Sequence, residues 1–273
     1  MEKVKLEKVK IIITAPTGKL GKLIVLQALD REDIQVIGGL GRRGAAYIGE
    51  DLGTLTGYGR ETGALVHGHL DSIIEEADMV VDFSQVDLSM EVLDSCLRYK
   101  KALVCGTTGF SQEQIEKIHR ASEEIPLMYA ANTSKAVNLM NHILELIAKN
   151  LGDQSQVDII EMHDKLKLDA PSGTSLEMGE TISQAMGLDF EKSIQYGKEG
   201  RGIREDDKIV YHSIRSGDIS SSHKVIFGLM GERMEIVHHA HNWNCFAKGA
   251  LDCAAFMHKK TKGLYSVQDI MSF

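Results

Sequence analysis

Two side chains suited to proton transfer and to anion binding, His163 and Lys167, stand four residues apart in the chain. Histidine gains or loses a proton near neutral pH, and lysine carries a positive charge with three hydrogen-bond donors. The Pro-Ser-Gly-Thr run at 171–174 predicts a turn that exposes the start of a helix, where backbone N–H groups and the helix dipole attract a carboxylate or a phosphate. This stretch therefore predicts a site that binds an anion and moves a proton.

A strand and a helix are expected to hold this loop in place. The apolar run 157–160 predicts a strand before His163, and residues 176–182 predict the first turns of a helix. Thr174 and Glu177 have the spacing of a capping box, in which a hydroxyl and a carboxylate satisfy backbone N–H groups at the helix start. The alternative interpretation is an ordinary surface loop followed by a well-capped helix.

Length, charge and cysteine content narrow the class of protein. The chain has 273 residues, 43% of them hydrophobic, which is enough for one large or two modest domains. Its formal net charge of -8 argues against nucleic acid as the main partner. No run approaches the roughly eighteen apolar residues of a membrane span, and the N-terminus lacks a signal-peptide core. The scattered cysteines, 4 in all, suit reduced thiols in a cytoplasmic protein.

Strands and helices alternate through the first half of the chain. Apolar runs predict strands at 9–13, 35–40, 78–83, 102–106 and 127–130. Helices are expected after the first strand and at 90–99 and 112–122. This alternation predicts a doubly wound parallel sheet with helices on both faces. Ligands of such sheets bind beyond the carboxyl ends of the strands.

The turn after the first strand has part of a dinucleotide-binding fingerprint. That fingerprint, G-x-G-x-x-G, uses its glycines for a tight turn and for close approach to a pyrophosphate. The chain has Gly18 and Gly21, but it carries Ala15 and Thr17 at the first two glycine positions. The pattern by itself is also compatible with an ordinary strand-to-helix turn.

Arg42 and Arg43 follow the second predicted strand, where NAD-binding proteins usually have an acidic residue for the ribose hydroxyls. Guanidinium groups suit the 2′-phosphate of NADP, because they form bidentate, charge-assisted hydrogen bonds. These arginines favour NADPH, with NADH as the alternative cofactor. A solvated basic turn would explain them without any ligand.

The second half combines long helices with several strands. Residues 137–151 have a single apolar stripe and end at Gly152, as expected of a helix. A closing helix is expected at 246–258. The runs 209–215, 223–227 and 233–239 predict three antiparallel strands, the first pair joined by a turn at 216–218, and 157–162 adds a fourth strand.

A histidine cluster, His238, His239 and His241, resembles a metal site in composition. Strand alternation places His239 and His241 on one face and His238 on the other, so the three rings cannot converge on one ion. We therefore expect no metal.

The stretch 161–174 resembles the signature of the 4-hydroxy-tetrahydrodipicolinate reductase family, also called dihydrodipicolinate reductases. The family pattern is roughly E-x-H-H-x-x-K-x-D-A-P-S-G-T. The matching positions are Glu161, His163, Lys167, Asp169, Ala170, Pro171, Ser172, Gly173 and Thr174. Residues 106–110 also match the family's G-T-T-G-F in full, and residues 130–134 match its A-A-N-F-S except at Thr133.

The resemblance implies an α/β architecture in which a Rossmann-like sheet is joined to an α+β domain with a mixed sheet for substrate binding and tetramer formation. It implies a dinucleotide-binding domain at 1–133, a substrate-binding and oligomerisation domain at 134–244, and a return to the first domain at 245–273. The implied protein is a cytoplasmic homotetramer that uses NADPH or NADH. Its implied reaction reduces 4-hydroxy-tetrahydrodipicolinate to tetrahydrodipicolinate in lysine and diaminopimelate biosynthesis.

The resemblance also implies roles for individual residues. His163 and Lys167 would be catalytic, and Arg42 matches the family's arginine, which favours NADPH. Substrate binding would fall to Asp164, Ser172, Gly173 and Thr174. Cofactor binding would fall to Ala15, Pro16, Thr17, Gly18, Lys19, Leu20, Arg42, Arg43, Gly106, Thr107, Thr108, Ala130, Ala131, Asn132 and Thr133.

Three positions depart from the family pattern. Asp164 replaces its second histidine, Gln85 stands in a Phe-Ser-Gln run that lacks its arginine, and Trp243 stands where an arginine is common. A carboxylate about 5 Å from a dianionic substrate would cost about 3 kcal/mol at an effective dielectric constant of about 20. Asp164 is therefore expected either to turn away and pair with Lys165 or to select a cyclic imine acid with one carboxylate fewer. A non-catalytic NADP-binding homologue and a structural oligomer are the further alternatives.

Overall fold

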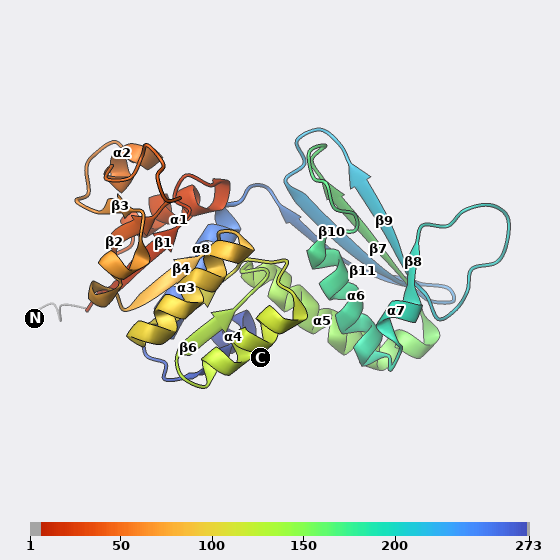
Figure 1. Cartoon of the computed structure of the whole chain (residues 1–273). Coiled ribbons are helices and arrows are strands. Elements are labelled where there is room, and N and C mark those ends of the chain that lie inside the picture. The colour runs from red at the N-terminus through yellow and green to blue at the C-terminus, as the bar shows by residue number, and fades with distance from the viewer. Residues whose placement is uncertain (1–6, 272–273) are drawn as a thin grey trace, which may run out of the picture. The chain divides into compact units, whose positions relative to one another are not determined.

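The computed structural model describes residues 7–271, which fall into two compact units (Figure 1). One unit joins the residues up to Lys135 with those from Asn244 onward, and the other is Ala136–Trp243. The last helix, α8 (Asn244–Met257), therefore folds with the first half of the chain. None of the helices in the described range is long and apolar enough to cross a bilayer.

The first unit contains a seven-stranded sheet in the order β12-β6-β5-β4-β1-β2-β3. Every neighbouring pair is parallel, which confirms the predicted doubly wound sheet. The strands are β1 (Val9–Thr14), β2 (Ile34–Leu40), β3 (Leu65–His67), β4 (Met79–Asp82), β5 (Ala102–Cys105), β6 (Pro126–Tyr129) and β12 (Gly263–Tyr265). The edge strands β3 and β12 were not predicted, because three residues are too few for a periodic pattern.

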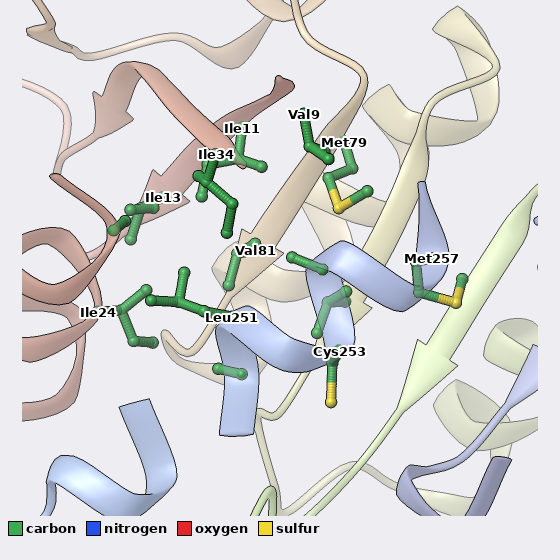
Figure 2. Close-up of a cluster of buried hydrophobic side chains, with 14 of the residues drawn as sticks. Val9, Ile11, Ile13, Ile24, Ile34, Met79, Val81, Leu251, Cys253 and Met257 are labelled. Atoms are coloured by element: carbon green, nitrogen blue, oxygen red, sulfur yellow. The ribbon is translucent and has the colours of Figure 1, made fainter. Parts of the chain in front are cut away.

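Helices cover both faces of this sheet, and each face buries an apolar cluster. On one face Ile24 and Leu251 pack with strand residues such as Ile13 and Val81 (Figure 2). On the other, the cluster includes Leu93 and strand side chains such as Leu103. The helices are α1 (Lys19–Leu29), α2 (Leu52–Thr56), α3 (Val86–Tyr99), α4 (Gln112–Ser122) and α8, with 3-10 turns η1 (Leu70–Ser72), η2 (Ile74–Glu76) and η4 (Val267–Ile270). Each fully buried large aliphatic side chain contributes about 1.5–3 kcal/mol.

The second unit contains a five-stranded mixed sheet in the order β11-β10-β7-β9-β8. The elements are α5 (Lys135–Leu151), η3 (Gly152–Gln154), β7 (Gln156–His163), α6 (Gly173–Ala185), α7 (Phe190–Ser193), β8 (Ile194–Tyr196), β9 (Ile209–Arg215), β10 (Ser221–Gly228) and β11 (Arg233–Ala240). Helices α5 and α6 bury their apolar residues, among them Leu144 and Ile182, against Ile159 and Phe227 of the sheet.

The predicted antiparallel arrangement is wrong for β9. This strand pairs in parallel with β7, and β10 pairs antiparallel with the other side of β7. The short turn at 216–218 suggested a hairpin between β9 and β10. Because β7 lies between these two strands in the sheet, the turn crosses the end of β7 instead. There the N–H of Ser216 donates to the carbonyl of His163, and the N–H of Lys165 donates to the carbonyl of Gly217. The turn thereby anchors the loop that begins at His163.

Candidate active site

His163 is the last residue of β7, and its ring is fixed by a carboxylate on the same face of that strand. Nδ1 of His163 lies 2.5 Å from Oε2 of Glu161, two residues earlier. Because side chains alternate along a strand, residues two apart point the same way. The Glu161 side chain is 0% exposed and that of His163 is 12% exposed.

Arg215 holds the other side of the Glu161 carboxylate. It is the last residue of β9, in register with His163, and its two terminal nitrogens lie 2.7 and 2.9 Å from the two carboxylate oxygens. Burial alone would raise the pKa of Glu161, but the hydrogen bonds from His163 and Arg215 lower that pKa to about 2. Arg215 also donates to the carbonyl of Asp169, so it ties the loop to the strands.

His223 brings several of the predicted residues together. It lies on β10 opposite Glu161, and its ring meets that of His163 edge-on with centroids 5.4 Å apart. Its Nε2 lies 3.1 Å from Oγ of Ser172. Burial, together with the nearby charges of His163 and Lys167, lowers the pKa of His223 to about 3. A neutral imidazole therefore stands at the centre of this group.

The cap of helix α6 lies two residues earlier than the sequence predicted. Ser172 is the N-cap, with its hydroxyl accepting from the N–H of Ser175, so the capping box of Thr174 and Glu177 is wrong. Glu177 instead accepts a hydrogen bond from Asn141 of α5. Because the Glu177 carboxylate is bound to α5, it does not accept from the backbone N–H groups at the start of α6. Ser172 is buried, whereas Gly173 is exposed at the helix start, with open space around it.

The loop between β7 and α6 carries Lys167 and Asp164 in different surroundings. Nζ of Lys167 lies 2.8 Å from Oδ1 of Asp169. Asp164 does not pair with Lys165; its carboxylate accepts a hydrogen bond of 2.8 Å from the N–H of Leu166. The Asp164 side chain thus stabilises the turn of its own loop.

The predicted cofactor residues of the first unit all follow carboxyl ends of parallel strands. Residues 15–20 follow β1, residues 42–43 follow β2, residues 106–108 follow β5 and residues 130–133 follow β6. The strand order reverses between β1 and β4, which is the kind of switch point where such sheets bind nucleotides.

The turn at the start of α1 has two backbone features that favour glycine, one at Ala15 and one at Gly21. Ala15 adopts a positive φ of 46°, where the pattern has glycine. A Cβ at Gly21 would lie 2.2 Å from the carbonyl oxygen of Ala15, so only glycine fits there. Pro16 is buried, Thr17 is exposed, and Gly18 caps α1 without a side chain. The N-terminus of α1 suits an anionic group, because no acidic residue lies in its first turn.

A fully buried carboxylate, Asp82, lies under the switch point at the end of β4. Its oxygens accept hydrogen bonds from Thr14 and Ser84 at 2.7 and 2.6 Å, and from Ser89. Thr107 joins the same group at 3.3 Å. Thr107 is therefore engaged inside the protein, whereas Thr108 beside it is exposed.

The remaining predicted residues differ in exposure. Arg42 is exposed, and Arg43 forms an exposed ion pair of 2.7 Å with Glu91 of α3. Thr133 is buried and donates to the carbonyl of Phe246, so it anchors the start of α8. In α1, Lys19 is the first residue and Leu20 packs against the apolar cluster. After β5, Gly106 packs against Phe83. After β6, Ala130 is buried, Ala131 is exposed, and Asn132 accepts a hydrogen bond from the N–H of Ser134.

Sequence reasoning missed Arg215 and His223 and gave no role to Glu161. Glu161 had a local signal, because it stands two residues before His163 on a predicted strand. Arg215 and His223 lie 52 and 60 positions after His163 in the sequence (215 − 163 and 223 − 163). Only the strand registers of β9 and β10 with β7 place them beside it.

The first unit has a Rossmann-like sheet with an open helix start, and the second unit carries the His163–Glu161 pair. Together they define the class of protein as a nucleotide-dependent oxidoreductase with a separate α+β unit. Two sequence profiles match almost the whole chain, the N-terminus of dihydrodipicolinate reductase over residues 9–133 and its C-terminus over residues 136–271. The chain therefore belongs to the dihydrodipicolinate reductase family and is an NAD(P)H-dependent oxidoreductase.

Individual relatives agree with that membership. A 4-hydroxy-tetrahydrodipicolinate reductase of Hahella chejuensis is 39% identical over 263 residues, which are 96% of this chain and 98% of that protein. A dipicolinate-bound dihydrodipicolinate reductase from Paenisporosarcina sp. TG-14 has a similar fold, with a TM-score of 0.77 and 24% identity over 97% of this chain and all of that one. An amine dehydrogenase from Mycobacterium smegmatis shares the fold at a TM-score of 0.63 and 12% identity, covering 96% of each chain.

Proposed function

We propose that the chain reduces 4-hydroxy-tetrahydrodipicolinate to tetrahydrodipicolinate with NADPH, in lysine and diaminopimelate biosynthesis. The reaction is the one for which the Hahella relative is named. The observation that carries the proposal is the grouping of His163, Lys167 and the start of α6 around His223. A proton donor, a cation and exposed helix N–H groups are what the reduction of an unsaturated cyclic dicarboxylate requires.

His163 is the general acid. When bound, the reduced nicotinamide supplies the hydride. Hydride addition leaves negative charge on the substrate ring, and His163 supplies the proton that neutralises it. Lys167 attracts one substrate carboxylate, exchanging its contact with Asp169 for the substrate. The backbone of Gly173, which is exposed, and of Thr174 receives the other carboxylate at the start of α6.

The hydrogen bond that Asp164 accepts within its own loop is compatible with a dicarboxylate substrate. Its carboxylate is engaged by the N–H of Leu166 in the turn of the loop. A carboxylate that serves as a local acceptor repels a bound dianion less than one that points at it. The geometry gives no reason to replace the dicarboxylate by a substrate with one carboxylate fewer.

The first unit is the cofactor-binding domain, and NADPH is preferred over NADH. The pyrophosphate would meet the N-terminus of α1, where Gly18 brings no side chain and Gly21 allows the helix to pack on the turn. Arg42 is exposed after β2 and suits a 2′-phosphate. Residues 106–108 and 130–133 would lie along the nicotinamide half.

The second unit, bounded as in the structure by Ala136 and Trp243, is the substrate-binding and oligomerisation domain. We propose a cytoplasmic homotetramer on the family pattern.

Steady-state turnover tests the proposal. Oxidation of NADPH is followed with enzymatically generated 4-hydroxy-tetrahydrodipicolinate. Wild type should turn over, His163→Gln should lose about 100-fold or more in kcat, and Lys167→Ala should mainly raise KM. The variant His212→Gln, on the opposite face of the same sheet, is the control. Turnover of a monocarboxylate imine with equal or better efficiency, or cofactor binding without turnover, would overturn the proposal.

A further inference from the structure

Glu161 occupies an unusual position for a carboxylate. It lies in the middle of the sheet of the second unit, on β7, with Ser213 of β9 opposite it on one side and His223 of β10 on the other. Its side chain is fully buried. A buried carboxylate is costly unless it is paired and hydrogen-bonded, so both of its partners contribute to keeping it in place.

Arg215 keeps Glu161 ionised and fixed. The guanidinium reaches both carboxylate oxygens, which is the bidentate geometry that arginine forms best with a carboxylate. Arg215 cannot give up its own proton within a protein. Glu161 therefore acts as an acceptor only, with an orientation set by the planar guanidinium.

An ionised carboxylate dictates where the imidazole carries its proton. Oε2 of Glu161 meets Nδ1 of His163, and a hydrogen bond between them requires the proton to be on Nδ1. Nε2 is then the ring nitrogen that remains for proton exchange. In serine proteases an aspartate selects the tautomer of the catalytic histidine in the same way.

We propose that Glu161, held by Arg215, is a positioning residue that keeps a proton on Nδ1 of His163, so that Nε2 delivers the proton to the substrate. The inference rests on the proposed function in assigning His163 as the acid. As the hydride adds to one atom of the substrate double bond, a proton leaves Nε2 for the adjacent atom. The imidazolium becomes neutral imidazole, Nδ1 stays protonated, and Glu161 stays ionised.

The same strand provides a matched control. Asp158 also pairs with one arginine and one histidine: its oxygens meet Arg204, and His212 at 2.9 Å. Asp158 lies an odd number of residues from Glu161, so it faces the opposite side of the sheet. Its carboxylate has no part in the proposed proton transfer.

The first test compares Glu161→Gln with Asp158→Asn. Glu161→Gln should lower kcat by about 100-fold or more, because a neutral amide no longer holds the proton-donating ring by a charge-assisted hydrogen bond, while KM for NADPH changes less than about threefold. Asp158→Asn should keep kcat within about twofold. Glu161→Asp, which retains the charge with a shorter reach, should recover part of the loss. Full kcat in folded Glu161→Gln would overturn the inference.

The second test needs no variant of Glu161. Nitrogen NMR of wild type labelled at histidine, with the His163 signals assigned through His163→Gln, reports which ring nitrogen is protonated in the neutral form. We expect the proton on Nδ1, and a proton on Nε2 would overturn the inference even if Glu161→Gln failed to fold. If wild type shows the Nδ1 proton but reduces none of the proposed substrate, the proposed function fails and the tautomer assignment stands.

Discussion

Lys167 and Asp169 form an ion pair within the loop after β7, with Nζ 2.8 Å from Oδ1. The Asp169 carboxylate is more than half exposed, whereas Lys167 is about a quarter exposed. Burial would raise the pKa of Asp169, but the hydrogen bond from Lys167 lowers it overall. The cation proposed to attract substrate is thus already paired with a carboxylate, which a substrate must displace.

Replacing Asp169 by asparagine should therefore tighten substrate binding. We expect KM for the dicarboxylate substrate to fall about two- to fivefold with kcat little changed, as expected when an exposed ion pair worth up to about 1 kcal/mol no longer competes. Steady-state titration of the substrate measures this. Asp94→Asn, which removes the exposed partner of Lys117, should leave KM unaltered. A rise in KM for Asp169→Asn would instead mean that the aspartate positions the lysine.

His223 should make the protein sensitive to mild acid. Its pKa is about 3 in the folded chain and about 6.5 in the unfolded chain, so between these values the unfolded chain binds more protons. The contribution of His223 to the free energy of unfolding is therefore fully present above pH 6.5. It falls by about 1.4 kcal/mol for each pH unit below that value. His238, whose pKa is lowered by burial and by His239, acts in the same direction.

Urea unfolding of wild type and His223→Gln between pH 7.5 and pH 5 checks this prediction. Gln can still meet Ser172, but it does not titrate. The variant should have a shallower decline in the free energy of unfolding as the pH falls. An equal decline in both proteins would contradict a buried neutral imidazole at this position.

Arg42 should contribute to cofactor preference more than Arg43. One good phosphate contact worth about 1.4 kcal/mol corresponds to a tenfold preference. Arg42→Ala should therefore lower kcat/KM for NADPH about tenfold and leave the value for NADH unchanged. Arg43→Ala should have a smaller effect, because Glu91 already engages its guanidinium. Equal losses with both cofactors for Arg42→Ala would mean that the side chain does not contact the 2′-phosphate.

Ala15→Gly should stabilise the first unit. Ala15 has a φ of 46°, in the left-handed region that penalises a Cβ by about 1 kcal/mol or more. Glycine removes that penalty but adds freedom to the unfolded chain, so a net gain of about 0.5 kcal/mol is expected in denaturant unfolding. Ala28→Gly, inside α1 where φ is helical, should destabilise by about 1 kcal/mol or more. Loss of stability in Ala15→Gly would contradict strain at this turn.

Local sequence patterns were sufficient to predict a strand or a helix where buried positions recur regularly along that element. The runs of β1, β4 and β5 are mostly apolar because both faces of a parallel sheet are covered. The stripe of α5 was evident because each turn buries a residue against the sheet. Short β3 and β12 have too few residues for any pattern, so they escaped prediction.

The sequence by itself determined the doubly wound sheet, the strand–loop–helix segment with His163 and Lys167, and the family resemblance, because each depends on residues close together in the chain. Only the tertiary structure decided that β7 separates β9 from β10, and that Arg215 and His223 flank the Glu161–His163 pair. Strand order and register bring together residues more than fifty positions apart, and no local spacing encodes such a contact.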